Sequence, residues 1–157
     1  MPRLPFAVVV TTLSVIFIDE RWKMDIAVRH NPFPVNEKFR GIYSHGVAVD
    51  AQARVLYVSG QIGVAPDGGL DESFRGQCAQ AFQNLEAVLK SAGMDFSNLV
   101  KMTFYLTRPQ DLDALVDVRR QYVEGVSPAI TTIFVAGLVD PNWLVEVEAV
   151  AADAPSA

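Results

Sequence analysis

The chain has 157 residues, half of them hydrophobic and a fifth charged, and its formal net charge is −5 at pH 7. These values suit one domain with a packed core and exclude a disordered chain. Lysine and arginine are scattered along the sequence, with no cluster long enough to follow a phosphate backbone, so nucleic-acid binding is not expected. The single cysteine, Cys78, excludes an intrachain disulfide and favours a reducing, cytoplasmic location.

Metal and cofactor motifs are absent from the sequence. It contains no CxxC, HExxH or Walker-type pattern, and its only histidines are His30 and His45. We therefore predict no metal site. His45 has two interpretations: a proton carrier or hydrogen-bond donor to a ligand near neutral pH, or a structural residue on a strand.

An apolar run from Leu4 to Ile18 lies near the N-terminus. It is shorter than the roughly 20 residues of a membrane-spanning helix, and no A-x-A-like cleavage site follows it. Three interpretations remain open: a start misassigned upstream of Met24, an extra strand or partner-contacting segment, or a targeting segment. We predict an N-terminal extension over residues 1–30 and a single domain over residues 31–157.

The segment that follows Met24 predicts irregular structure before the first strands. The lead RHNPFPVNEKFRG, residues 29–41, is interrupted by prolines. Two strands are predicted next, over residues 42–49 and 54–60. Asp-Ala-Gln-Ala separates them at residues 50–53, and this spacing favours a hairpin.

A helix is predicted over residues 73–92, because apolar residues recur there at helical spacing. Asp71 or Ser73 can cap its start, and Gly93 lies where a left-handed residue is expected after its end. Cys78 falls on the apolar stripe, so its thiol is predicted to be buried in the core. The stripe consists of Phe74, Cys78, Ala81, Phe82, Leu85, Val88, Leu89 and Ala92.

The second half of the chain predicts a strand over residues 99–107, a helix over 108–122, and two final strands over 129–137 and 143–151. Pro109 suits the first turn of the helix, and Gly125 suits its end. The predicted buried side of this helix consists of Leu112, Leu115, Val116, Tyr122 and Val123. The order β-β-α-β-α-β-β predicts an α+β domain with two helices on one mixed sheet.

The predicted strands VLYV, MTFYL and ITTIFV are apolar or threonine-rich on both faces. A sheet with one solvated face normally shows alternation of apolar and polar residues. Because two helices can cover only one face, we expect the other face to pack against further subunits. The sequence therefore favours a homo-oligomer, with sites between subunits.

Two strand ends carry polar residues that suit a ligand cleft. Ser59, Gly60 and Gln61 end one strand, where glycine either permits a bend or lets a ligand approach the backbone. Glu146 and Glu148 lie on one side of the last strand. They belong either to a solvated edge or to an acid/base site, where an enclosed carboxylate can position water.

Several motifs together resemble the RidA/YjgF family. They are GIYSHGV, LYVSGQIGV, the helix QCAQAFQNLEAVLKSAGMDFSNLVKMTFYLT, SPAITTIFVAGL and VEVEAVA, and the resemblance covers about residues 39–152. It implies a chorismate-mutase-like subunit, a homotrimer with small-molecule clefts at subunit interfaces, and no cofactor. The activity it implies is cofactor-free hydrolysis of reactive 2-enamine or 2-imine acids to 2-keto acids and ammonia.

The resemblance also assigns residues to the site. The tyrosine that lines the family's pocket falls on Tyr43, the serine at the strand end on Ser59, and the glutamate that holds the attacking water on Glu148. The arginine that binds the substrate carboxylate falls on Ile130, and a cysteine or serine two residues later falls on Thr132. The strand therefore has an isoleucine where the family pattern has its anion-binding residue. Arg108, at another strand end, is either a replacement cation or a solvated loop residue.

Three functions follow as hypotheses. The first is a deaminase-type hydrolase whose activity is altered or lost because Ile130 replaces the arginine, with Glu148 as the catalytic residue. The alternative is a non-catalytic homotrimer that binds a small metabolite or acts like a chaperone. An endoribonuclease is least favoured, because the chain is acidic and lacks a paired histidine set. No membrane partner is predicted.

Overall fold

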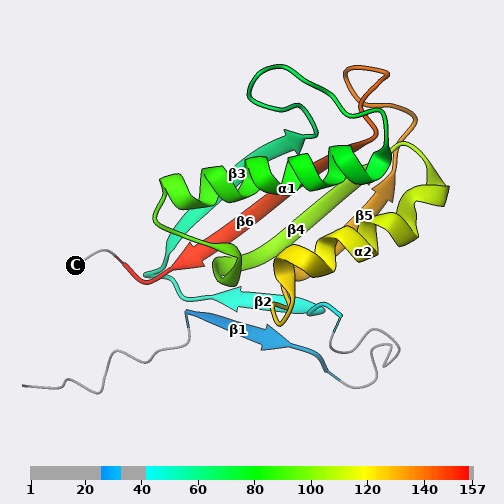
Figure 1. Cartoon of the computed structure of the whole chain (residues 1–157). Coiled ribbons are helices and arrows are strands. Elements are labelled where there is room, and N and C mark those ends of the chain that lie inside the picture. The colour runs from blue at the N-terminus through cyan, green and yellow to red at the C-terminus, as the bar shows by residue number, and fades with distance from the viewer. Residues whose placement is uncertain (1–25, 33–41, 156–157) are drawn as a thin grey trace, which may run out of the picture.

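The computed structural model describes residues 26–32 and 42–155 (Figure 1). The predictions for residues 1–25 lie outside the described residues. The strands are β1 (Ala27–His30), β2 (Gly46–Val49), β3 (Arg54–Ile62), β4 (Leu99–Leu106), β5 (Ala129–Phe134) and β6 (Val145–Asp153), and the helices are α1 (Phe74–Ser91) and α2 (Leu112–Val123). The predicted α+β class is confirmed.

The main sheet has four strands in the order β3-β6-β4-β5. β6 runs antiparallel to both of its neighbours, whereas β4 and β5 are parallel and are connected through α2. A parallel pair requires such a crossover connection, which explains why a helix lies between these two strands in the chain. The last strand of the sequence therefore lies inside the sheet.

The structure corrects two predictions for the first part of the chain. β1 forms where an irregular lead was expected, so Arg29 and His30 lie in a strand. The hairpin between β2 and β3 is also wrong, because β2 pairs with β1 in a separate two-stranded sheet. The chain does turn at Asp50, whose carbonyl accepts from the amide of Ala53. A turn of this kind reverses the chain without requiring the two strands to pair.

Helix α1 begins and ends as its sequence predicts. Ser73 is the N-cap and accepts a hydrogen bond from the amide of Gly76, while the Asp71 carboxylate accepts from both the amide and the hydroxyl of Ser73. These bonds from Ser73 lower the pKa of Asp71. Gly93 has a φ of 69°, which glycine adopts at little cost. The Cys78 side chain is fully buried, as predicted.

Helix α2 differs in detail from its predicted pattern. Pro109 lies in a short 3₁₀ turn that precedes the helix, and Gly125 follows it with a φ of 77°. Leu115 and Val123 are buried as predicted, but Leu112 is 40% exposed, so its prediction is wrong. Arg119 is buried instead, a position that the apolar pattern did not indicate.

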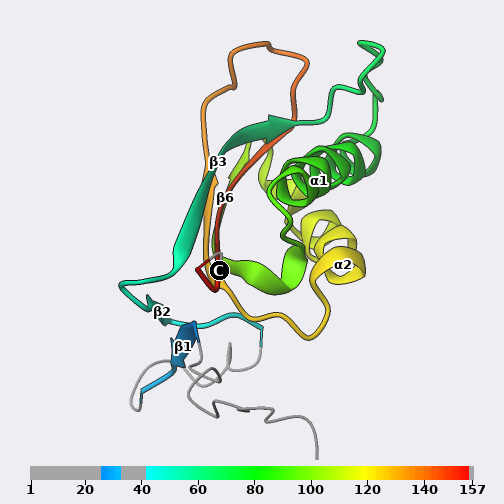
Figure 2. The same cartoon turned by 90° about the vertical axis from the view of Figure 1, so that its left-hand side faces the viewer.

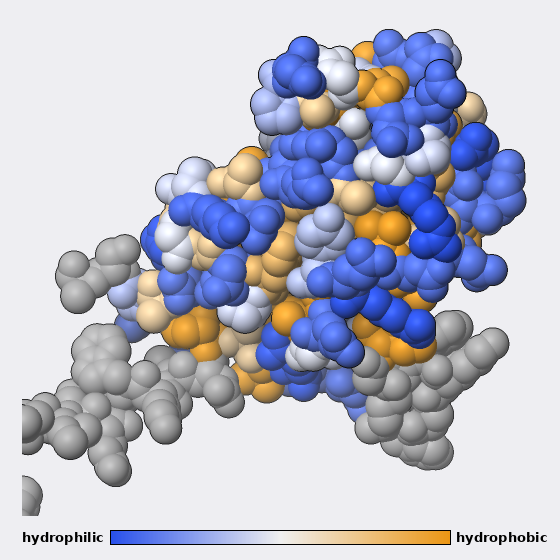
Figure 3. Space-filling model, in the orientation of Figure 1, coloured by the Kyte–Doolittle hydropathy of each residue, from blue (hydrophilic) through white to orange (hydrophobic). Residues whose placement is uncertain are grey.

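Both helices cover one face of the main sheet, and no element among the described residues covers the other (Figure 2). The core lies between the helices and the sheet, with Phe82, Leu85 and Phe104 fully buried. On the uncovered side, which we call the open face, the Tyr57 side chain is 79% exposed. Hydrophilic side chains dominate the opposite side of the molecule, which carries the helices (Figure 3).

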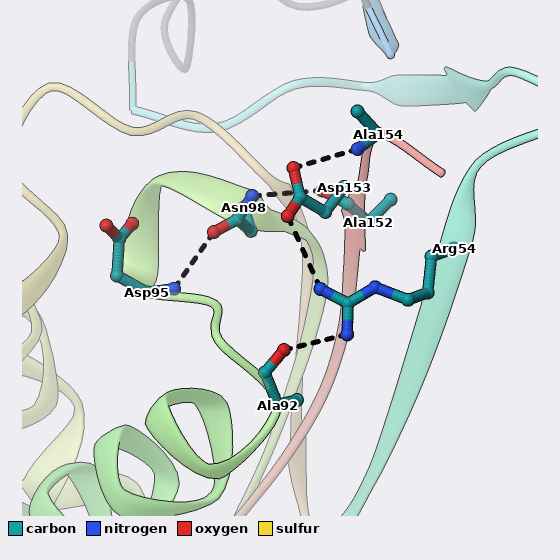
Figure 4. A network of polar contacts seen from close by, with 7 residues as sticks. All are labelled: Arg54, Ala92, Asp95, Asn98, Ala152, Asp153 and Ala154. Carbon is teal, nitrogen blue, oxygen red and sulfur yellow. Dashed lines mark hydrogen bonds and ion pairs between the residues drawn. The ribbon is translucent and has the colours of Figure 1, made fainter. Parts of the chain in front are cut away.

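A polar network joins the end of α1 to two strands (Figure 4). The guanidinium of Arg54 on β3 donates to the carbonyl of Ala92 at 2.7 Å and to the carboxylate of Asp153 on β6 at 3.4 Å. The Asn98 amide donates to the carbonyl of Ala152. Arg54 thus satisfies a backbone carbonyl at the end of α1 and joins it to the end of β6. In the described ranges, no helix has the length and apolar character needed to cross a membrane.

Candidate functional site

A β-bulge shapes the pairing of β3 with β6. Val58 pairs with Ala149 and Gln61 pairs with Val147, so β3 has one more residue than β6 between these pairs. Ser59 and Gly60 therefore lie opposite Glu148. Bulges of this kind redirect side chains next to functional sites. Here the bulge brings the predicted VSGQ motif beside the predicted catalytic glutamate.

Gly60 lies against the side chain of Glu146. A Cβ atom at this position would lie 1.7 Å from Oε1 of Glu146. The absence of a side chain at Gly60 therefore leaves room for the Glu146 side chain in its present position. The Gln61 side chain donates back to the carbonyl of Ser59 at 3.0 Å.

A cleft of about 280 Å³ lies on the open face, above β3, β6 and β4. We call it the open-face cleft. Its lining consists of Tyr57, Val58, Ser59, Lys101, Thr103, Glu148, Ala149 and Val150. It combines a carboxylate, an ammonium and three hydroxyl groups with apolar surface. This combination suits a small polar ligand held by a few directed groups.

Glu148 is held in this cleft by Tyr105 on β4. The Tyr105 hydroxyl donates to Oε2 of Glu148 at 2.9 Å. This bond, together with the negative charge of the carboxylate, raises the pKa of Tyr105. The hydroxyl is therefore favoured as a donor, and the bond orients the carboxylate.

Lys101 supplies the positive charge of the open-face cleft. Its ammonium donates to the hydroxyl of Thr131 and to the carbonyl of Met102. Partial burial lowers the pKa of Lys101, and the negative charge of Glu148 opposes this effect. The cleft therefore holds a carboxylate and an ammonium that influence each other, next to the bulged segment of β3.

Tyr43 and His45 lie elsewhere, at the start of β5. Between them, Ser44 donates from its amide to the carbonyl of Pro128 at 3.0 Å and from its hydroxyl to the carbonyl of Ser127 at 2.6 Å. The rings of Tyr43 and His45 meet edge to face, with centroids 5.3 Å apart. Ser44 therefore fixes both predicted residues against the SPAI segment.

Ile130 and Glu148 point to opposite faces of the sheet within one chain. Ile130 pairs with the fully buried Met102 on β4 and packs against the core beneath the helices. Thr132 pairs with Phe104 and is directed to the same side, whereas Glu148 pairs with Thr103 on the open face. One chain thus separates the predicted site residues into two groups.

Within one chain, Arg108 does not line the open-face cleft. Its Nε atom donates to the carboxylate of Asp111 at 2.6 Å, three residues further along the chain. It lines a different hollow, together with Leu70 and Asn142, and that hollow does not include Glu148.

Sequence reasoning missed Lys101, Thr103 and Tyr105. They alternate with the buried residues Met102 and Phe104, and this alternation predicts a strand with one polar face. The prediction that MTFYL is apolar or threonine-rich on both faces did not indicate that one of these faces is polar. No group of three histidine, cysteine or acidic side chains that could hold a metal ion occurs in the described part of the chain.

A mixed sheet with two helices on one face and a polar cleft on the other defines a chorismate-mutase-like α+β subunit. Solved structures support this class. One of them is the Rid-family protein YyfB from Yersinia pestis, a protein of unknown function. Its structure has a TM-score of 0.72 to this chain at 28% sequence identity. The match covers 80% of this chain and 98% of YyfB.

The sequence model of the Endoribonuclease L-PSP family matches residues 36–153. A protein of Rattus norvegicus named 2-iminobutanoate/2-iminopropanoate deaminase is 38% identical over 117 residues, covering 73% of this chain and 82% of its own length. A RutC family protein of Aquifex aeolicus is 39% identical over 123 residues, covering 76% of this chain and 91% of its own. The chain therefore belongs to this family, which is also called RidA/YjgF, as its motifs predicted.

Proposed function

We propose that the protein is a deaminase-type hydrolase that acts on reactive imines or enamines, with a substrate anchor different from that of its relatives. The observation that carries this proposal is the placement of Glu148. Its carboxylate lies in the open-face cleft opposite the Ser59–Gly60 bulge and accepts a hydrogen bond from Tyr105. The name of the rat relative supports the reaction class.

In the proposed reaction, the Glu148 carboxylate accepts a proton from water as the water oxygen bonds to the imine carbon. The C=N π electrons move to nitrogen, which takes up a proton, and a carbinolamine forms. The hydroxyl proton then passes to nitrogen, the C–N bond breaks as the oxygen forms the carbonyl, and ammonia leaves. Imine and water are thereby converted to a carbonyl compound and ammonia, without oxidation or reduction.

Ile130 is the residue that changes how the substrate is anchored relative to the family pattern. An arginine fork supplies two charge-assisted hydrogen bonds, each worth roughly 1.5–3 kcal/mol. Its loss from this position weakens binding or turnover of a 2-imino acid anchored there by about 10²–10⁴-fold. The substrate of this chain is therefore less anionic than those of its relatives, or its carboxylate binds another residue.

We further propose a homotrimer. The two groups of predicted site residues, Glu148 with Ser59 and Tyr43 with Ile130, are separated within one chain, and the open face has no cover among the described elements. Sites built between subunits would reunite the groups. A cytoplasmic location is part of the same proposal, because the one cysteine is a buried thiol.

The test is ammonia release from enzymatically generated 2-imino acids with different side chains. Wild type is compared with Glu148→Ala and with Ile130→Arg, and Glu146→Ala, on the same strand, is the control. We expect Glu148→Ala to lose at least about 10²-fold in rate, as for other acid/base groups. We expect Ile130→Arg to gain activity that depends on Glu148. Equal rates for wild type and Glu148→Ala would contradict the proposal.

A second candidate function is favoured by Ile130 alone: a non-catalytic trimer that binds a small metabolite. If wild type releases no ammonia from any imine yet binds the corresponding 2-oxo acids, this function replaces the first. An endoribonuclease remains the least favoured, since the net charge of −5 disfavours RNA.

A further inference from the structure

Arg119 is a largely buried cation, and one donor of its guanidinium has no hydrogen-bond partner. The residue is only 8% exposed, and its Nε atom has no hydrogen-bond partner. Among the residues that the structure describes, no carboxylate forms an ion pair with it. A buried donor without a partner costs free energy, and an anion that accepts from this guanidinium would offset that cost.

The surroundings of Arg119 increase this cost. Burial lowers the pKa of Arg119, and the positive charge of the adjacent Arg120 lowers it further. Both residues lie in the last turns of α2. An anion placed between α2 and the following loop would be attracted by both cations, and it would relieve their mutual repulsion.

A cleft of about 230 Å³ opens beside these arginines, and we call it the arginine cleft. Ile42, Val123 and Val126 give it apolar walls. Glu124 also lines it, with an exposed side chain that forms no ion pair with either arginine in the described ranges. The cleft therefore offers a guanidinium next to a small apolar surface.

The arginine cleft adjoins both segments of the predicted substrate site. Ser127 lines the arginine cleft and begins the SPAI segment, and its carbonyl accepts a hydrogen bond from the hydroxyl of Ser44. Ile42 also lines the cleft and directly precedes Tyr43. Arg119 and Ile130 lie on the same, helix-covered side of the sheet. A cation from α2 thus lies beside the segment that leads into the strand containing Ile130.

We propose that Arg119 binds the carboxylate of a small aliphatic 2-oxo or 2-imino acid in the arginine cleft. The identity of the acid rests on the proposed function, whereas the anion site rests on the unpartnered guanidinium. The planar guanidinium presents paired donors that match a carboxylate, and the apolar walls fit a short aliphatic chain. Inorganic phosphate would fill the same fork but leave those walls without a contact.

The experiment measures binding of 2-oxobutanoate to the purified full chain by calorimetry. We expect Arg119→Met to weaken binding by about 10²-fold, as loss of a charge-assisted fork predicts. Arg119→Lys keeps the charge without the fork and should lie in between. The matched control is Arg75→Met, which removes an exposed arginine that pairs with Asp117 on α2. It should bind like wild type.

Thermal unfolding without ligand separates a binding role from a structural one. Because Arg119→Met removes an unpaired buried charge, it should raise the Tm while it weakens binding. A lower Tm would mean that the guanidinium supports the fold, and equal affinity in wild type and Arg119→Met would also overturn the proposal. Binding of inorganic phosphate without binding of 2-oxobutanoate would contradict the carboxylate assignment.

Binding through Arg119 and release of ammonia are separate measurements, so the two proposals can fail independently. A protein that binds 2-oxobutanoate through Arg119 but releases no ammonia from imines retains the anion site and lacks the activity. A protein that releases ammonia equally well with Arg119→Met retains the activity, and Arg119 is then not its anchor.

Discussion

The Tyr105 hydroxyl on β4 donates a hydrogen bond of 2.9 Å to the Glu148 carboxylate on β6. The two residues are diagonal neighbours, since Tyr105 pairs with Glu146 and Thr103 pairs with Glu148. Long side chains at diagonal positions reach each other across antiparallel strands. The bond restricts the rotation of a carboxylate that would otherwise move freely at the sheet surface.

Tyr105→Phe should therefore lower kcat for ammonia release by roughly 10-fold, because the carboxylate loses its orienting partner. The free energy of unfolding should change little, since the bond is exposed. The bond also raises the pKa of Tyr105 above its ordinary value of 10.0, so the wild-type donor persists at pH 10. A phenylalanine variant with unchanged kcat would show that Tyr105 does not orient Glu148.

Tyr57 tests the proposed trimer. Its side chain is 79% exposed on the open face. If this face packs against other subunits, Tyr57→Glu should convert the trimer to monomers, because it places an unpaired charge in a buried interface. Sedimentation velocity gives the oligomeric state. Gln83→Glu, an equal change of charge on the exposed side of α1, should leave the trimer intact. A wild-type monomer would contradict the trimer itself.

Two glycines should differ in their response to alanine. At Gly60 the new Cβ meets the end of the Glu146 side chain, which can rotate away, so Gly60→Ala should cost about 1 kcal/mol of unfolding free energy. At Gly63 the Cβ would lie 2.5 Å from Cα of Gln77, on the backbone of α1. Gly63→Ala should cost about 3 kcal/mol, because the helix must move. Chemical denaturation measures both, and an equal cost would contradict the reasoning.

The buried thiol of Cys78 should make the free energy of unfolding depend on pH. Burial raises the pKa of its thiol from 9.0 to about 12. Above pH 9 the unfolded chain loses this proton while the folded chain keeps it, so the free energy of unfolding falls as the pH rises. The slope approaches about 1.4 kcal/mol per pH unit between the two pKa values.

The comparison with Cys78→Ala isolates this contribution from the lysines and tyrosines that titrate in the same range. The alanine variant should lose less stability than wild type between pH 9 and pH 10.5. The native thiol should also resist a thiol reagent at pH 8 and react after unfolding. Rapid modification of the folded protein would show that the thiol is accessible.

Local patterns in the sequence determined most of the secondary structure. The helical spacing after Ser73 specified α1 together with its cap, because hydrogen bonds and side-chain periodicity within a helix involve residues close in sequence. The two-residue period of VEVEAVA placed Glu146 and Glu148 on one face for the same reason. The family motifs predicted the fold.

Strand pairing and burial depended on contacts between distant residues, and only the tertiary structure decided them. The turn at Asp50 suits a hairpin, yet β2 pairs with β1, because partners compete across the whole chain. The bulge at Ser59, the opposite faces of Ile130 and Glu148, and the burial of Arg119 all follow from register and packing. By itself, the sequence determined which residues share a strand or a helix face. The fold decided which of them meet, because their contacts join segments far apart in the chain.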